Sequence, residues 1–130
     1  MSPLESLYQK YPDYRVDLEP ANKCVTVRLD GVLIAKSTRA VVVRETKHDP
    51  VIYFPREDVR LDLLERTDHE TFCPFKGQAS YWTLRVGEHV EENAVWSYED
   101  PFEEVAALKN YVSFYADRVE WENEPPPLGS

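Results

Sequence analysis

The sequence has few cysteines, the residues that stabilise small domains through disulfides or metal sites when the core is small. It contains only two cysteines, Cys24 and Cys73, among 130 residues. Two cysteines cannot build a disulfide framework, so we interpret both as reduced thiols. No C-x-x-C pair is present to supply a four-ligand zinc site. His69 and Cys73 are four residues apart, a spacing that on a strand separates them by roughly 13 Å. The sequence therefore predicts neither a metal nor a cofactor.

Positive charge and long apolar runs are also scarce. Fifteen Lys and Arg residues are outnumbered by 24 Asp and Glu residues, which gives a formal net charge of −9. Such an acidic surface repels phosphate, so nucleic acid is not an expected partner. No apolar run approaches the length of a membrane span, and residues 1–5 do not resemble a signal peptide. We expect a cytoplasmic, acidic protein with no membrane partner.

Apolar and aromatic residues, in contrast, are sufficient for a core. The hydrophobic fraction is 42% and the aromatic fraction 12%. A chain of this length is typically one domain, and it buries about two-thirds of its unfolded surface. We place the domain at residues 14–122, after a leader at 1–13. The tail at 123–130 includes three consecutive prolines and is expected to be disordered.

Alternation of apolar and polar residues predicts a mainly β fold. The clearest signal is a hairpin, with strands at 24–29 and 32–35 joined by a type I′ turn at Asp30-Gly31. Together with the next two strands, this hairpin is expected to form an antiparallel meander. The first strand is expected at a sheet edge, where it could pair with a second copy to form a homodimer. The other predicted strands are 14–18, 40–44, 51–54, 71–73, 79–86, 94–98, 111–115 and 118–121.

Prolines indicate two short helices. Pro55 favours a helical turn at 56–59. Asp100 is predicted to cap a second helix, with Pro101 at its first position. The buried stripe of this helix is expected to be Phe102, Val105 and Ala106.

A turn predicted at Pro74–Gly77 concentrates the candidate chemistry. Lys76 lies in this turn between Phe75 and Tyr81, where partial desolvation would lower its pKa toward amine or base chemistry. A charged Lys76 could instead hold a carboxylate or a phosphate. Cys73 could be a nucleophile activated by Lys76. The interpretation we favour is that Cys73 is a small buried residue that closes the turn.

Arg56 and Asp58 follow an apolar strand and a proline, a position at which functional groups are often presented. They could equally form a surface ion pair. Arg56 opposite Lys76 would create a cationic spot suited to a small anionic ligand. The aromatic residues must divide between core and pocket, and several lining one cavity would suit a planar or cyclic ligand.

Four blocks of the sequence are recognisable when taken together. They read V-I-Y-F-P-R-E-D-V from Val51, D-H-E-T-F-C-P-F-K-G-Q-A-S-Y-W from Asp68, E-N-A-V-W-S-Y-E-D-P-F from Glu92 and Y-V-S-F-Y-A-D-R-V-E-W from Tyr111. In these blocks the chain resembles the DUF427 family of small bacterial and fungal domains of unknown function, over residues 14–122. The family is sometimes labelled a nucleotidyltransferase domain, but the sequence lacks the usual glycine-serine and paired-aspartate metal site.

The resemblance implies a compact β-rich domain similar to the β-tent folds, in which two small antiparallel sheets surround a pocket. With the one or two short helices, the expected fold is mainly β, or β-rich α+β. The expected function is a metal-independent enzyme acting on a small polar or anionic metabolite, and the alternative is a non-catalytic module that binds such a small molecule. The catalytic candidates are Lys76, Asp58, Tyr81 and Cys73, and the ligand-binding candidates are Arg56, Tyr53, Trp96, Tyr98, Phe114 and Tyr115.

Overall fold

The structure is a computed structural model that describes residues 10–124. Most of the predicted leader and most of the predicted tail therefore lie outside the described residues. At the C-terminal end, the last strand continues to Glu124, beyond the predicted domain end at residue 122.

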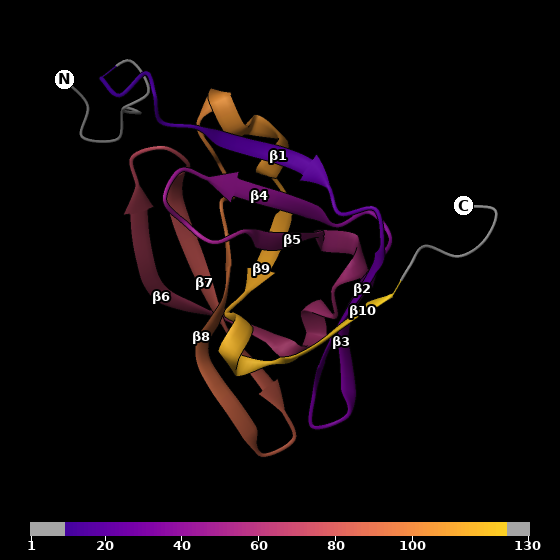
Figure 1. The fold of residues 1–130 in the computed structure, drawn as a ribbon. Coiled ribbons are helices and arrows are strands. Elements are labelled where there is room, and N and C mark those ends of the chain that lie inside the picture. Colours follow the sequence, from indigo (N-terminus) through magenta and orange to yellow (C-terminus); the bar gives the residue numbers. More distant parts are fainter. Residues whose placement is uncertain (1–9, 125–130) are drawn as a thin grey trace.

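The described residues form two antiparallel sheets, which confirms the mainly β prediction (Figure 1). The larger sheet has the strand order β1-β4-β5-β9-β8-β7-β6 and the smaller one β10-β2-β3. In chain order the strands are β1 (Val16–Pro20), β2 (Cys24–Leu29), β3 (Val32–Ser37), β4 (Val41–Glu45), β5 (Val51–Pro55), β6 (Leu64–Cys73), β7 (Gly77–Val86), β8 (His89–Ser97), β9 (Tyr111–Phe114) and β10 (Glu120–Glu124). Short 3-10 helices connect them, namely η1 (Arg56–Asp58), η2 (Leu61–Leu63), η3 (Glu103–Leu108) and η4 (Ala116–Arg118).

The predicted hairpin is present, but the predicted meander is wrong. Asp30 and Gly31 both have positive φ, 51° and 78°, as a type I′ turn requires. The hairpin β2–β3 leaves the main sheet and pairs with β10, while β4 pairs with β1 and β5. The physical reason is that a separate sheet places Val25, Val27 and Ile34 of the hairpin in the core against the face of the larger sheet.

The second predicted helix is also different from expectation. Instead of an α-helix capped by Asp100, the chain forms the 3-10 helix η3, with Phe102 in an extended conformation before it. Val105 interrupts its helical geometry with φ −128° and ψ 32°, and the buried residues are Val105 and Leu108, whereas Ala106 is exposed. The backbone N–H of Phe102 donates to the carbonyl of Lys76, which holds this segment extended. The helical turn predicted after Pro55 is confirmed as η1.

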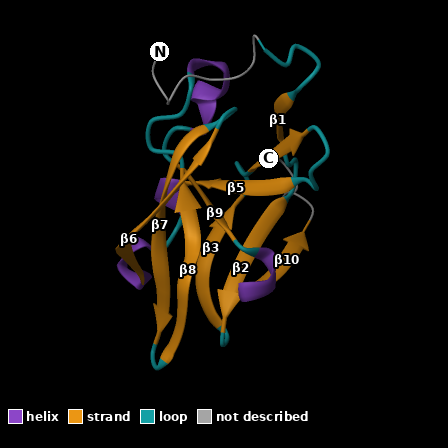
Figure 2. Ribbon diagram, turned by 90° about the vertical axis from the view of Figure 1, so that its left-hand side faces the viewer, coloured by secondary structure: helices purple, strands orange, loops and turns teal. Residues whose placement is uncertain are grey.

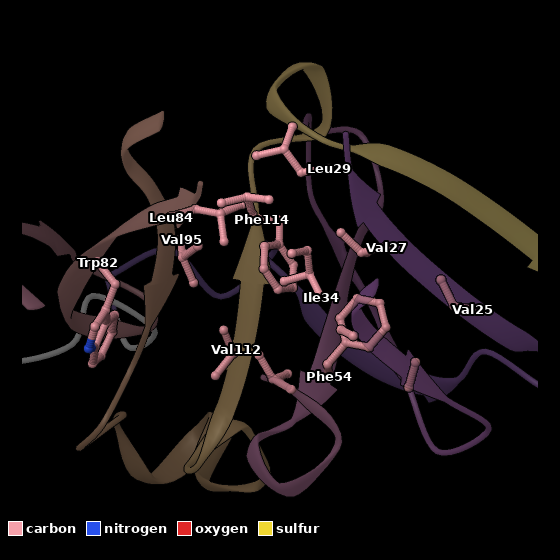
Figure 3. Packing of buried hydrophobic residues seen from close by; sticks show 14 residues of the cluster. Val25, Val27, Leu29, Ile34, Phe54, Trp82, Leu84, Val95, Val112 and Phe114 are labelled. Carbon is pink, nitrogen blue, oxygen red and sulfur yellow. The ribbon is translucent and has the colours of Figure 1, made fainter. Parts of the chain in front are cut away.

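The two faces of the larger sheet contribute to two different hydrophobic clusters. One face packs against the smaller sheet, and Figure 3 shows the apolar side chains that meet there. Figure 2 shows the strands of the smaller sheet running beside β8 and β9. On the other face, Val43 of β4 and Tyr81 of β7 belong to one buried cluster although their strands are far apart in the sheet order. The larger sheet therefore curls around this second cluster.

Candidate functional site

A cavity of about 660 Å³ lies on the curled face of the larger sheet. Its walls come from strands β4 to β8, from the β4–β5 and β6–β7 turns, and from Tyr14, Tyr98 and Tyr115. Alternation along the strands explains which residues reach it, because Tyr53 faces the cavity while Phe54 faces the core between the sheets. Its lining is rich in aromatic rings, namely Tyr14, Tyr53, Phe72, Phe75, Tyr81, Trp96, Tyr98 and Tyr115.

The β6–β7 turn places Lys76 in the cavity wall. Cys73 pairs with Gly77 in the hairpin register, and the N–H of Lys76 donates to the Cys73 carbonyl at 3.2 Å. Gly77 has φ 113°, a conformation that L side chains rarely adopt, so glycine is required at this bend. Beside Lys76, the ring of Phe75 stacks on the ring of Tyr14 with centroids 3.7 Å apart. The turn is thus fixed by the backbone and by an aromatic contact.

Lys76 forms a buried ion pair with Glu45, the last residue of β4. Only 11% of the Lys76 side chain and 10% of the Glu45 side chain are exposed. The other Glu45 carboxylate oxygen accepts a hydrogen bond from the Tyr14 hydroxyl. Burial alone would raise the pKa of Glu45, but the hydrogen bonds from Lys76 and Tyr14 outweigh it and hold the pKa below its usual value. Glu45 is therefore ionised at neutral pH, with both oxygens occupied.

Tyrosine hydroxyls dominate the remaining polar groups of the cavity. The indole N–H of Trp96 donates to the Tyr53 hydroxyl at 3.0 Å, and the Tyr81 hydroxyl lies 2.9 Å from that of Thr71. Within residues 10–124, the Tyr98 hydroxyl makes no hydrogen bond to the protein, while the Lys76 ammonium lies 5.8 Å from the centre of its ring. Burial raises the pKa of both Tyr53 and Tyr98 well above that of an ordinary tyrosine.

Tyr115 lies at a more open part of the lining. Its ring packs on Trp96 with centroids 4.7 Å apart, and 43% of the residue is exposed. Burial, followed by the neighbouring Tyr81 hydroxyl, raises the pKa of Tyr115 to about 12. The tyrosines at the cavity whose pKa is raised therefore stay protonated at neutral pH and can donate hydrogen bonds to a ligand.

A family model described as a domain of unknown function, DUF427, matches residues 17–124. The chain belongs to the DUF427 family. The match covers most of the chain and confirms the resemblance recognised in the four sequence blocks. A comparison with curated proteins found no match.

The structure brings seven of the ten candidate residues of this DUF427 domain to the cavity. They come from four strands, from the β6–β7 turn and from the residues that follow β8 and β9. All of them are lining residues, namely Tyr53, Cys73, Lys76, Tyr81, Trp96, Tyr98 and Tyr115.

The other three candidates lie elsewhere. Phe114 is buried in the core between the sheets. The carboxylate of Asp58 accepts hydrogen bonds from Ser37 at 2.6 Å and from Arg39 at 3.1 Å, so it ties η1 to the end of β3. Arg56 is not among the lining residues. The predicted wall of Arg56 and Asp58 opposite Lys76 is thus not present.

Four polar residues of the lining are not among the candidates predicted from the sequence, namely Tyr14, Glu45, His48 and Asp49. Glu45 shares a strand face with Val43, two residues earlier in an apolar strand. The alternation in the sequence predicts that Glu45 and Val43 share a face of their strand, but nothing in the sequence indicates that this face lines the cavity. Tyr14 was assigned to an edge strand, whereas β1 begins at Val16 and Tyr14 precedes it.

A second hollow of about 470 Å³ lies beside the β6–β7 hairpin of this DUF427 domain. Its lining includes the carboxylates of Glu70, Glu99, Asp100 and Glu103. Glu99 is paired with Arg66 at 2.8 Å and lies 3.7 Å from Arg56. The charged partner of Arg56 is therefore Glu99, a lining residue of this second hollow.

Among residues 10–124, no three His, Cys, Asp or Glu side chains converge in a way that could hold a metal ion. No helix within the same residues is long and apolar enough to cross a membrane.

Proposed function

We propose that the cavity binds a small polar metabolite and that Lys76 and Glu45 perform acid–base chemistry on it. The observation that carries this proposal is the position of the ion pair, which is buried at the wall of a cavity and in contact with it. The cavity volume of about 660 Å³ lies within the range typical of small-molecule sites.

The ion pair is difficult to explain as a device for stability alone. Removing two charges from water costs several kcal/mol for each ion, and a well-packed apolar pair of similar volume is often equally stable or more stable. The cavity beside the pair supplies another reason for its presence, because a ligand there would meet a positioned donor and a positioned base.

The lining favours a ligand that carries hydrogen-bond acceptors. Tyr53 and Tyr98 remain protonated, and Lys76 has more N–H groups than its one carboxylate partner uses. Glu45 already accepts on both oxygens. The charge of Lys76 is balanced by Glu45, so a neutral carbonyl oxygen suits the site as well as an anionic oxygen does. Flat aromatic walls favour a planar ligand.

One observation favours the non-catalytic alternative. The pKa of Glu45 lies below its usual value, and such a carboxylate is a weak base in the empty cavity. A binding module would need only the hydrogen bonds and the aromatic walls. NMR of the ligand distinguishes the two functions. A non-catalytic module that is stabilised by a ligand leaves that ligand chemically unchanged, whereas an enzyme converts it.

The proposal is tested with a double variant, Lys76→Met with Glu45→Leu, that removes both charges. A single Lys76→Met variant would leave Glu45 buried without its cation and lose about 3–5 kcal/mol, whereas the double variant should fold with a stability close to that of the wild type. In a thermal-shift screen of a metabolite library, a ligand at a hundred times its dissociation constant adds about 2.7 kcal/mol to the wild type.

We expect the hits to lose this stabilisation in the double variant. The matched control removes an exposed pair, Arg85→Met with Glu65→Leu, whose nitrogen and oxygen lie 3.1 Å apart on the surface. Hits should stabilise the control as they do the wild type. If the Lys76/Glu45 double variant is stabilised equally, the ion pair takes no part in binding and the proposal is wrong.

A further inference from the structure

We propose that Lys76 is an amine nucleophile that forms an imine with an aldehyde or a ketone bound in the cavity. This inference rests on the proposed small-molecule site and names its substrate class. Lys76 is the only lysine lining the cavity in the part of the chain that the structure describes. Lysines in contact with water are usually protonated and unreactive, so a buried primary amine at a cavity wall is the group to consider first.

The groups around the Lys76 nitrogen match the needs of imine formation. Attack on a carbonyl requires a free amine, and the carboxylate of Glu45 is hydrogen-bonded to the nitrogen and can take its proton. A planar ligand that fills the cavity displaces water from the ion pair. Loss of water disfavours both charges, so the neutral pair of amine and carboxylic acid becomes more accessible once the ligand is bound.

Hydroxyl donors are available for the carbonyl oxygen. The Tyr53 hydroxyl accepts from Trp96 and keeps its own proton for donation, and within residues 10–124 the Tyr98 hydroxyl has no protein partner. Both rings line the same cavity as Lys76. Hydrogen bonds from such donors stabilise the negative charge that develops on a carbonyl oxygen under attack.

The chemical step balances without any further reactant. A proton passes from the Lys76 ammonium to Glu45, and the nitrogen lone pair forms a bond to the carbonyl carbon as the π pair moves to the oxygen. That oxygen takes the proton held by Glu45, which gives a carbinolamine still protonated on nitrogen. A second proton then passes from this nitrogen through Glu45 to the hydroxyl group, the C–O bond breaks to release water, and the freed nitrogen lone pair forms C=N. Net, one carbonyl compound and the ammonium give one iminium ion and one water molecule.

The test traps the imine by reduction in the full-length protein. Benzaldehyde, which is planar and neutral, and pyruvate, which is anionic, are each incubated with the protein and sodium cyanoborohydride at neutral pH. Peptide mapping by mass spectrometry then measures the modification rate at every lysine. We expect Lys76 to react with at least one probe about tenfold faster than the exposed Lys47, because a cavity that holds the carbonyl raises its effective concentration.

Two variants make the result specific. Glu45→Gln keeps an oxygen beside Lys76 but removes the base, so trapping at Lys76 should slow by about a hundredfold while Lys47 is unaffected. Lys47→Arg removes the exposed comparison site and should leave the rate at Lys76 unchanged.

Each outcome decides between the two proposals. If Lys76 is trapped no faster than Lys47 by either probe, the imine inference is overturned. Should metabolites still stabilise the wild type but not the Lys76/Glu45 double variant, the binding site itself stands. Should no member of the library distinguish those two proteins, the proposed function fails instead.

Discussion

Gly77 is the residue on which the position of Lys76 depends. Its φ of 113° lies outside the small left-handed region that other residues can adopt. A Cβ atom at this position would have ordinary room, with the nearest atom, the Asp100 carbonyl oxygen, at 3.4 Å. The constraint is therefore the backbone conformation and not a lack of space.

We predict that Gly77→Ala destabilises the protein by about 1–3 kcal/mol, because the alanine backbone is strained at this φ. Urea unfolding measures the change. Gly87→Ala is the matched control: Gly87 also has positive φ, but its value of 58° lies in the left-handed region that alanine can adopt, and nothing lies within 4 Å of an added Cβ. The control should lose clearly less stability. Equal losses in both variants would show that the special conformation of Gly77 carries no cost.

At the same scale, Lys76 and Glu45 show what could be predicted about the site. Lys76 stood out in the sequence because it is a cation in a turn flanked by aromatic residues. Its partner did not, because a glutamate at the end of a strand is ordinary and only the curl of the sheet brings β4 across from β7. The prediction that Arg56 and Asp58 face Lys76 was wrong for the same reason. Their partners in space, Glu99 and Ser37, are distant from them in the sequence.

At the scale of elements, alternation predicted where the strands lie but not how they divide between sheets. The hairpin β2–β3 was identified from its turn, whereas Phe114 was expected to bind a ligand and lies in the core instead. Its placement in the core depends on the smaller sheet covering β9, a contact between segments far apart in the chain. Local patterns contain no information about such pairings, since loop closure over long separations is decided by the whole set of tertiary contacts.

Strand β5 illustrates the two faces of the larger sheet with adjacent residues. Phe54 is fully buried and packs on Phe114 and Trp121, whereas the Tyr53 hydroxyl faces the cavity side and accepts the Trp96 indole N–H. We predict that Phe54→Ala costs about 3–5 kcal/mol, because it empties the core between the sheets. Tyr53→Phe should cost only about 1 kcal/mol, the value of one hydrogen bond.

Urea unfolding of the two variants checks this contrast, and metabolite binding adds a second readout. Tyr53→Phe should weaken the response to ligands that stabilise the wild type, because it removes a donor from the cavity. A Tyr53→Phe variant as unstable as Phe54→Ala would contradict the assignment of the two faces.

At the scale of the whole molecule, the two sheets are joined by a charged contact as well as by the core. The turn of the β2–β3 hairpin and the turn between β7 and β8 both lie at the lower end of Figure 1. His89 connects them, since its Nδ1 lies 2.8 Å from Asp30 of the first turn and its Nε2 lies 3.0 Å from Glu91 of β8. Arg118 of η4 also donates to Glu91, at 2.9 Å. A histidine with a carboxylate at each ring nitrogen is held in its protonated form.

The hydrogen bond to Glu91, followed by that to Asp30, raises the pKa of His89 above its ordinary value of 6.5. Because the pKa is raised in the folded state, the stabilisation is fully present below about pH 6.5 and is lost as the pH rises through the raised value. We predict that the melting temperature of the wild type exceeds that of His89→Gln at pH 6 and that the difference shrinks toward pH 8.5. Asp30→Asn removes the carboxylate that the β2–β3 turn contributes to this contact. It should reduce the pH dependence without abolishing it, because the carboxylate of Glu91 still contacts His89. If the difference in melting temperature between the wild type and His89→Gln is constant with pH, the contact between the sheets does not depend on protonation of His89. The core alone would then determine the stability of the packing between the sheets.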